Sequence, residues 1–145
     1  PAERTKSGRA ISIPLPPASI EMLTELKYRA VGSEYVFPNR RASKTPYMGK
    51  DTINRAIDSM FGIAQGKKVQ PKIQLVTMEH FTPHDLRRTF RTLLSELGVT
   101  EEVAEACMNH APGKLIKTYN RNRFFEERKK ALALLEHAVK SILYK

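Results

Sequence analysis

The sequence predicts a mainly α-helical fold with a small β-hairpin or sheet, an α+β class. Apolar residues recur at helical spacing along most of the 145 residues, and capping residues and glycines mark where these segments begin and end. One short stretch near the front alternates apolar and polar residues, as a strand does. The hydrophobic content of 41% is enough for a globular core. We therefore expect one domain over residues 1–145.

The β element is expected at the front of the chain. ISIPL, residues 11–15, alternates apolar and polar side chains. Together with Arg4 and Thr5 upstream, it suggests a hairpin that turns at Lys6-Ser7-Gly8.

Most of the remaining chain is expected to be helical. Four of the six expected helices have an N-terminal cap or a C-terminal glycine, and the long last one is recognised by its 3.6-residue apolar period. These helices span residues 19–32, 52–61, 83–98, 101–107, 115–119 and 124–143. Between them we expect a short strand at 35–37, a polar and basic surface loop at 39–50 and a β-like patch at 73–76.

The net charge favours a polyanionic partner. Lys and Arg outnumber Asp and Glu by 25 to 15, which gives a formal charge of +10. A surplus of this size favours nucleic acid over a membrane surface or an acidic protein. A merely soluble basic protein would carry the same charge, so charge alone does not decide the function.

Cysteine content and hydropathy bound the setting of the protein. Cys107 is the single cysteine, so no disulfide can form within the chain, which fits a reducing, intracellular compartment. It falls in an expected helix, where a small buried apolar side chain is the simplest role. No apolar run approaches the roughly 20 residues that span a bilayer, and we expect no membrane partner.

The stretch TPHDLRRTF gathers a histidine and two arginines at the start of an expected helix. Thr82 suits the N-cap, Pro83 suits the first helical position, and Asp85 is placed to reach back to the cap. At about 100° per residue, cationic side chains fall on one side of this helix and apolar ones on the other. The cationic set is His84, Arg87, Arg88 and Arg91, and the apolar set is Leu86, Phe90, Leu93, Leu94 and Leu97.

A helix N-terminus attracts anions, so a cationic face that starts there predicts a site for phosphate or carboxylate. The alternative is a solvated basic face with a capping histidine.

A second group of residues follows the next expected helix. His110 stands at a helix-to-turn boundary, and Tyr119 lies nine residues further on. Cations surround this tyrosine in sequence, namely Lys114, Lys117, Arg121 and Arg123. Such surroundings favour the phenolate form, which a nucleophile attacking a phosphate diester needs. Taken singly, a histidine is more often a structural residue, and a tyrosine more often packs its ring in a core.

This combination resembles the tyrosine recombinases, also called phage-type integrases. His84-x-x-Arg87, then His110, then Tyr119 nine residues later, is similar to the C-terminal signature of that family.

The front of the chain carries the resemblance further. RTKSGRAISIPL is similar to the β-hairpin of the family, in which Lys6 matches the catalytic lysine. The resemblance runs from about Arg4 to the last expected helix, and it implies a fold like the tyrosine recombinase catalytic domain. One departure is that the family usually has Leu-Gly before its second histidine, where this chain has Met108 and Asn109.

The resemblance implies a mechanism for site-specific DNA recombination, in which a 3′-phosphotyrosyl intermediate forms and is then reversed by the hydroxyl of another strand. Tyr119 would be the nucleophile, while Arg87 and His110 would bind the non-bridging phosphate oxygens. His84 would handle the tyrosine proton, a role that suits imidazole near neutrality. Lys6 would protonate the leaving 5′-oxygen.

The same resemblance implies partners and setting. Double-stranded DNA is the expected partner, together with other integrase protomers in a tetramer on DNA, without a cofactor or a metal. We expect a cytoplasmic, nucleoid-associated protein encoded by a bacterium or a phage. The residues expected to contact DNA phosphates are Arg88, Arg91, Lys114, Lys117 and Arg121.

In the family, the first catalytic arginine and the core- and arm-binding domains lie upstream of the hairpin lysine, where this chain has no match for them. We therefore expect the chain to be the C-terminal part of the catalytic domain of a longer integrase. Since loss of one charge-stabilising donor costs about 10²–10³ in rate, the isolated chain is expected to be nearly inactive.

Three other functions compete with this prediction. A non-catalytic DNA-binding module would use the same cationic helix only to grip phosphates. A type IB topoisomerase would share the chemistry, but the hairpin and the spacing from His110 to Tyr119 favour a recombinase. A metal-dependent nuclease is disfavoured because the sequence shows no clustered Asp, Glu and His ligand set.

Overall fold

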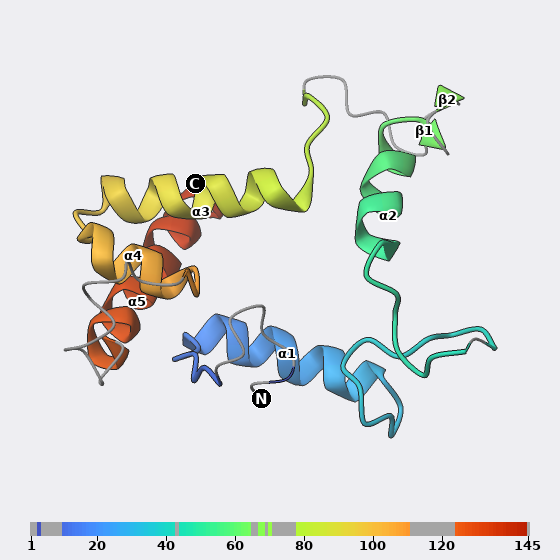
Figure 1. Ribbon diagram of the computed structural model, residues 1–145, viewed down its shortest axis with the longest axis horizontal. Coiled ribbons are helices and arrows are strands. Elements are labelled where there is room, and N and C mark those ends of the chain that lie inside the picture. The colour runs from blue at the N-terminus through green and yellow to red at the C-terminus, as the bar shows by residue number, and fades with distance from the viewer. Residues whose placement is uncertain are drawn as a thin grey trace. The chain divides into compact units, whose positions relative to one another are not determined.

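The protein is mostly helical, as the sequence predicts (Figure 1). The computed structural model describes Glu3 and residues 10–42, 44–64, 67–68, 70, 78–110 and 124–144. The helices are α1 Pro17–Arg29, α2 Thr52–Met60, α3 Pro83–Glu96, α4 Glu101–Cys107 and α5 Phe125–Leu143, and the strands are β1 Ile63–Ala64 and β2 Lys67–Lys68. Among the described residues, no helix has the length and apolar character needed to cross a bilayer.

The chain divides into two compact units. One unit contains residues 1–22 and 90–145, and the other contains residues 23–89. Both boundaries fall inside helices, within α1 and within α3, so each of these helices contributes residues to both units.

The core of the first unit lies among the C-terminal half of α3, α4 and α5. Leu94, Val103, Ala104 and Ala131 are buried and form one cluster. Two of these four residues are alanines, whose small side chains let helix backbones approach closely. The partly buried residues that pack against the cluster are Phe90, Val99, Cys107, Phe124 and Leu135.

Glycine ends α3 and turns the chain toward α4. Gly98 has a φ of 74°, a left-handed conformation that favours glycine. Its N–H donates to the Ser95 carbonyl at 3.0 Å, and the Val99 N–H donates to the Leu94 carbonyl at 3.0 Å. These two bonds define a Schellman motif, and the contact of Val99 with the Leu94 cluster completes it. The predicted helix end at Gly98 is confirmed.

The second unit contains α2 and the two strands. Ile57 is the buried residue of α2. Next to the end of α2, the ring of Phe61 meets the rings of Phe81 and His80 edge-on, with centroids 5.7 and 5.1 Å apart. His80 also contacts Asp58 of α2, with 2.9 Å between Nε2 and Oδ1. These contacts fix the segment that leads into α3 against the end of α2.

The β structure differs from the prediction. Residues 10–16 form no strand in the described part of the chain, and the predicted turn at Lys6-Ser7-Gly8 lies outside it. Pro14 lacks the N–H that a ladder needs, which limits pairing through this segment. The sheet that the structure does show is an antiparallel pair, with Ile63 opposite Lys68 and Ala64 opposite Lys67. Only Gln65 and Gly66 separate its strands in sequence, a hairpin spacing, and no strand was predicted at this place.

The expected strand at residues 35–37 is also wrong. The structure has instead an isolated antiparallel bridge between Pro38 and Tyr47, which closes the basic loop expected at 39–50. The rings of Tyr35 and Tyr47 pack at 5.1 Å between centroids beside this bridge. The expected loop is thus present, with its two ends held together.

Helix positions were predicted better than burial. The apolar stripe of α3 includes Leu86, which is 57% exposed, and that of α5 includes Ile142, which is 64% exposed. Ile20 and Leu23 of α1 and Ile53 of α2 are exposed as well. Periodicity identifies the side of a helix that can be buried, whereas burial also requires a packing partner at each turn.

Candidate active site

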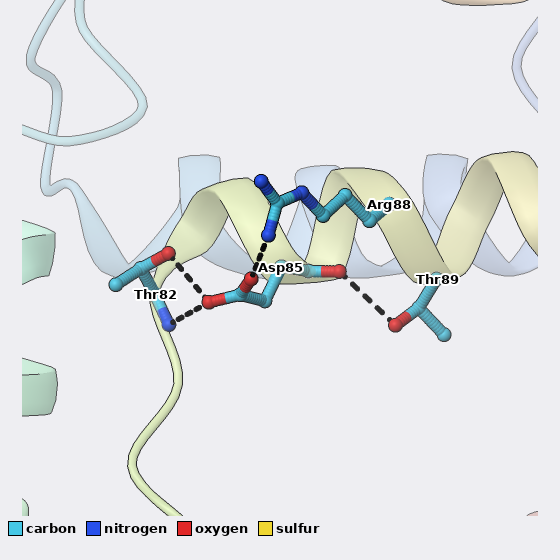
Figure 2. Close-up of polar contacts among 4 residues, drawn as sticks. All are labelled: Thr82, Asp85, Arg88 and Thr89. Atoms are coloured by element: carbon cyan, nitrogen blue, oxygen red, sulfur yellow. Dashed lines mark hydrogen bonds and ion pairs between the residues drawn. The ribbon is translucent and has the colours of Figure 1, made fainter.

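The N-terminus of α3 is built by Thr82 and Asp85 (Figure 2). The backbone N–H of Thr82 donates to Asp85 Oδ2 at 2.9 Å, so the acid reaches back to the cap as predicted. The Thr82 hydroxyl donates to the same oxygen at 2.8 Å. Both bonds lower the pKa of the Asp85 carboxyl below its usual value, and the bond from the hydroxyl has the larger effect. Asp85 is therefore ionised at neutral pH and keeps the first turn of α3 closed.

Asp85 also holds part of the cationic face. Arg88 donates to Asp85 Oδ1 at 3.2 Å, and the Thr89 hydroxyl donates to the Asp85 carbonyl at 3.0 Å, as Figure 2 shows. The Arg88 side chain is 72% exposed, and an ion pair of this kind is worth only about 0–1 kcal/mol. Its guanidinium can therefore exchange Asp85 for another anion at small cost.

The four predicted cations of α3 are all on this one helix. His84, Arg87 and Arg88 are exposed, whereas the side chain of Arg91 is only 28% exposed. Arg91 comes one helical turn after Arg87. The helix therefore presents imidazole and guanidinium groups from its positive end onward.

His110 follows α4 through a second Schellman motif. The Asn109 N–H donates to the Ala106 carbonyl at 3.1 Å, and the His110 N–H donates to the Glu105 carbonyl at 3.0 Å. Asn109 has a φ of 54°, so it takes the left-handed position where the resembled family usually has glycine. Met108, which precedes Asn109, is buried. The departure from Leu-Gly therefore preserves the turn.

Glu105 joins His110 to α3. Its Oε1 accepts a hydrogen bond from Arg91 Nε at 2.9 Å, and its Oε2 contacts His110 Nδ1. The hydrogen bond from Arg91, followed by that with His110, lowers the pKa of the Glu105 carboxyl. The three side chains belong to one unit of the chain, and they bring together two of the predicted site residues, Arg91 and His110.

Glu105 was not among the predicted site residues. Side chains that meet on a helix surface are three or four residues apart in sequence, so helix geometry does not predict a contact between an acid and a histidine five residues later. The contact arises from the turn at Asn109, which folds His110 back over the last turn of α4. Asparagine is one of the residues that end helices in a left-handed conformation, so Asn109 was the sequence signal for this turn and for the contact that it allows.

Cys107 lies beside this turn and is half-buried against the core cluster. Burial raises the pKa of its thiol, so it is protonated at neutral pH. This agrees with the expected role as a small apolar side chain.

The remaining predicted site residues lie outside the described part of the chain. They are the nucleophile candidate Tyr119, the lysine candidate Lys6 and the predicted phosphate contacts Lys114, Lys117 and Arg121. Their roles stay predictions. Within the described ranges, no group of three or more His, Cys, Asp or Glu side chains is arranged to hold a metal ion.

Arg91 of α3, Glu105 of α4 and His110 thus form one hydrogen-bonded group within the first unit. The phage integrase family profile matches residues 2–126, and the chain belongs to this family. It is 29% identical over 130 residues to Prophage integrase IntA of Escherichia coli (strain K12). This alignment covers 89% of the chain and 28% of the relative, so the chain spans less than a third of the relative's length. No solved structure matches the chain.

Proposed function

We propose that this chain carries the strand-cleaving residues of a site-specific DNA recombinase that integrates or excises a mobile element. The observation that carries the proposal is the arrangement on α3 and α4 in a member of the phage integrase family: Arg87 and Arg91 lie one turn apart, and Glu105 links Arg91 to His110. Guanidinium and imidazole groups are what a transferring phosphoryl group requires around it.

The proposed reaction is a transesterification. The Tyr119 oxygen attacks the phosphorus of a DNA phosphodiester, the bond from phosphorus to the 5′-oxygen breaks, and a 3′-phosphotyrosyl link forms. Lys6 gives a proton to the leaving 5′-oxygen, and His84 takes the tyrosine proton. The hydroxyl of another strand then attacks the link and reverses these steps. Since one phosphodiester bond is exchanged for another, the reaction needs no energy-rich cofactor.

Charge stabilisation is the proposed task of Arg87 and His110. Negative charge grows on the non-bridging oxygens as the nucleophile arrives, and donors fixed in advance stabilise it most. The capped N-terminus of α3 adds its positive dipole end on the same helix. The exposure of His84 and Arg87 is consistent with access to a DNA backbone.

The proposed DNA contacts do not read sequence. Arg88, Arg91, Lys114, Lys117 and Arg121 would position the duplex through its phosphates. The charge of +10 supports double-stranded DNA as the partner, and the family supports assembly with further protomers on DNA. A cytoplasmic, nucleoid-associated setting follows from that partner.

The substitution Tyr119→Phe in the full-length integrase tests this function. It removes the attacking oxygen and keeps the ring, so covalent attachment to a nicked suicide DNA is expected to disappear while DNA affinity stays within about twofold. Tyr144→Phe is the matched control, because Tyr144 is 82% exposed at the end of α5, and it is expected to retain attachment. Wild-type protein that binds DNA and never attaches to it would instead support a non-catalytic DNA-binding module.

A further inference from the structure

One carboxylate, that of Glu105, contacts two nitrogen-bearing side chains near the end of α4. Glu105 accepts from Arg91 Nε with one oxygen and contacts His110 Nδ1 with the other. The Glu105 and Arg91 side chains are partly shielded, with 37% and 28% of their surfaces exposed. Both oxygens of the carboxylate are therefore engaged, one with Arg91 of α3 and the other with His110 after the turn that ends α4.

This contact decides which ring nitrogen of His110 carries hydrogen. Arg91, and after it His110, lowers the pKa of Glu105, so the carboxylate is ionised at neutral pH and can only accept. His110 Nδ1 must then be the donor toward Glu105. The other nitrogen, Nε2, is left to meet a ligand, and it carries a hydrogen of its own only in the doubly protonated ring.

The backbone reinforces this orientation. The His110 N–H donates to the carbonyl of Glu105, the same residue whose side chain contacts the ring. His110 is thus held to Glu105 at two points, and rotation of the imidazole would break the side-chain contact. Through Arg91, the same carboxylate also ties the ring to α3.

We propose that Glu105 is a positioning residue of the recombinase, which holds His110 through Nδ1–H so that Nε2–H of the doubly protonated ring points to the scissile phosphate and donates to it. This proposal rests on the proposed function. In DNA cleavage, Glu105 touches no reacting atom and acts through His110. Outer partners that orient a ligating histidine in metal sites contribute about 10–100-fold to activity, and an effect of that size is expected here.

The substitution Glu105→Gln makes the proposal measurable. The amide oxygen can still accept from Arg91, but the amide NH₂ then faces His110 Nδ1 and donates to it. The neutral ring is therefore expected to change its proton from Nδ1 to Nε2. Glu102→Gln, an exposed position in the first turn of the same helix, removes the same charge and is expected to leave the ring unchanged.

The tautomer is read by long-range ¹H–¹⁵N spectra of full-length integrase labelled at histidine, recorded at about pH 9, above the usual titration range of histidine. The His110 signals are identified by their loss in His110→Gln. The proposal predicts Nδ1–H in the wild type and in Glu102→Gln, and Nε2–H in Glu105→Gln. A wild-type ring protonated at Nε2 would overturn it, whether or not the variants fold.

Single-turnover attachment to a nicked suicide DNA separates positioning from a structural role. At saturating protein, Glu105→Gln is expected to slow attachment about 10–100-fold with DNA affinity within about twofold. In a His110→Ala background the same change is expected to cost nothing further, since residues that act through one another are not additive. An equal cost in both backgrounds would refute the proposal. If the wild type forms no adduct, the proposed function fails, and the spectra alone then decide whether Glu105 sets the ring.

Discussion

Asn109 is the residue on which the position of His110 depends most. It occupies a left-handed conformation in the turn after α4, with a φ of 54°. Asparagine tolerates this conformation better than most residues because its short polar side chain can bond locally. The positive φ of Asn109 thus reverses the chain direction, so that His110 contacts Glu105.

Asn109→Val is expected to destabilise this turn. A β-branched residue at positive φ is a conformational outlier, and the left-handed conformation costs about 1–2 kcal/mol per residue. Urea denaturation followed by circular dichroism measures the loss, and DNA attachment is expected to fall as His110 loses its support. Asn109→Gly is the matched control, since glycine is the usual residue at this position. Equal stability of the valine and glycine variants would contradict the assigned turn.

The proposed mechanism gives Arg87 a catalytic role beyond DNA binding. Arg87→Ala is expected to slow DNA attachment about 10²–10³-fold at saturating protein, because it removes one donor from the charged transition state. Single-turnover kinetics on a nicked suicide DNA measure the effect. Arg55→Ala, an exposed arginine on α2, is the control and is expected to change the rate less than twofold. Equal rates for the two variants would remove Arg87 from the proposed mechanism.

At the scale of elements, the core of the first unit supports the proposed site. Leu94 of α3 is fully buried against α4 and α5 residues, and the same stretch of α3 carries Arg91 on its polar side. Ala104 is also fully buried, one position before Glu105. Packing between α3 and α4 therefore sets the distance between the helices, which places Arg91 within hydrogen-bonding distance of Glu105.

Leu94→Ala is expected to destabilise the protein by about 2–5 kcal/mol, the usual cost of a cavity at a fully buried leucine. The midpoint of urea unfolding measures this change. Leu86→Ala is a matched control on the same helix, because Leu86 is 57% exposed, and its effect is expected to stay within about 0.5 kcal/mol. A cost at Leu86 as large as that at Leu94 would contradict the described core.

The elements also show where sequence patterns were informative. The Thr82 and Asp85 cap and the ends of α3 and α4 depend on neighbours within a few residues, so local rules predicted them. The strand at residues 11–15 was predicted from alternation and from the resemblance to the family's hairpin, although Pro14 removes a ladder donor. The contact between Glu105 and Arg91 joins residues 14 apart on two helices, and no local pattern reports it.

At the scale of the whole molecule, the excess of positive charge and the family define the expected partner. The chain carries a net charge of +10 and belongs to the phage integrase family. The order and spacing of His84, Arg87, His110 and Tyr119 predicted this family from sequence, because such a signature is a property of the chain. Whether these residues meet around one phosphate depends on the three-dimensional arrangement of the assembled protein. Their convergence is therefore a proposal.

DNA affinity is expected to fall steeply with salt. Each phosphate neutralised by Lys or Arg releases counterions, so six to ten contacts reduce affinity about 10³–10⁵-fold between 50 and 200 mM salt. Fluorescence anisotropy of the full-length integrase with a labelled duplex measures the slope. A slope near zero would show that phosphate contacts do not dominate and would contradict the proposed role of the cationic residues.

The most direct test is to locate the covalent link. Full-length integrase is trapped on a nicked suicide DNA, digested with protease and nuclease, and the modified peptide is sequenced by mass spectrometry. The account predicts a nucleotide joined through its 3′-phosphate to Tyr119. A link at any other residue, or through a 5′-phosphate, would contradict it.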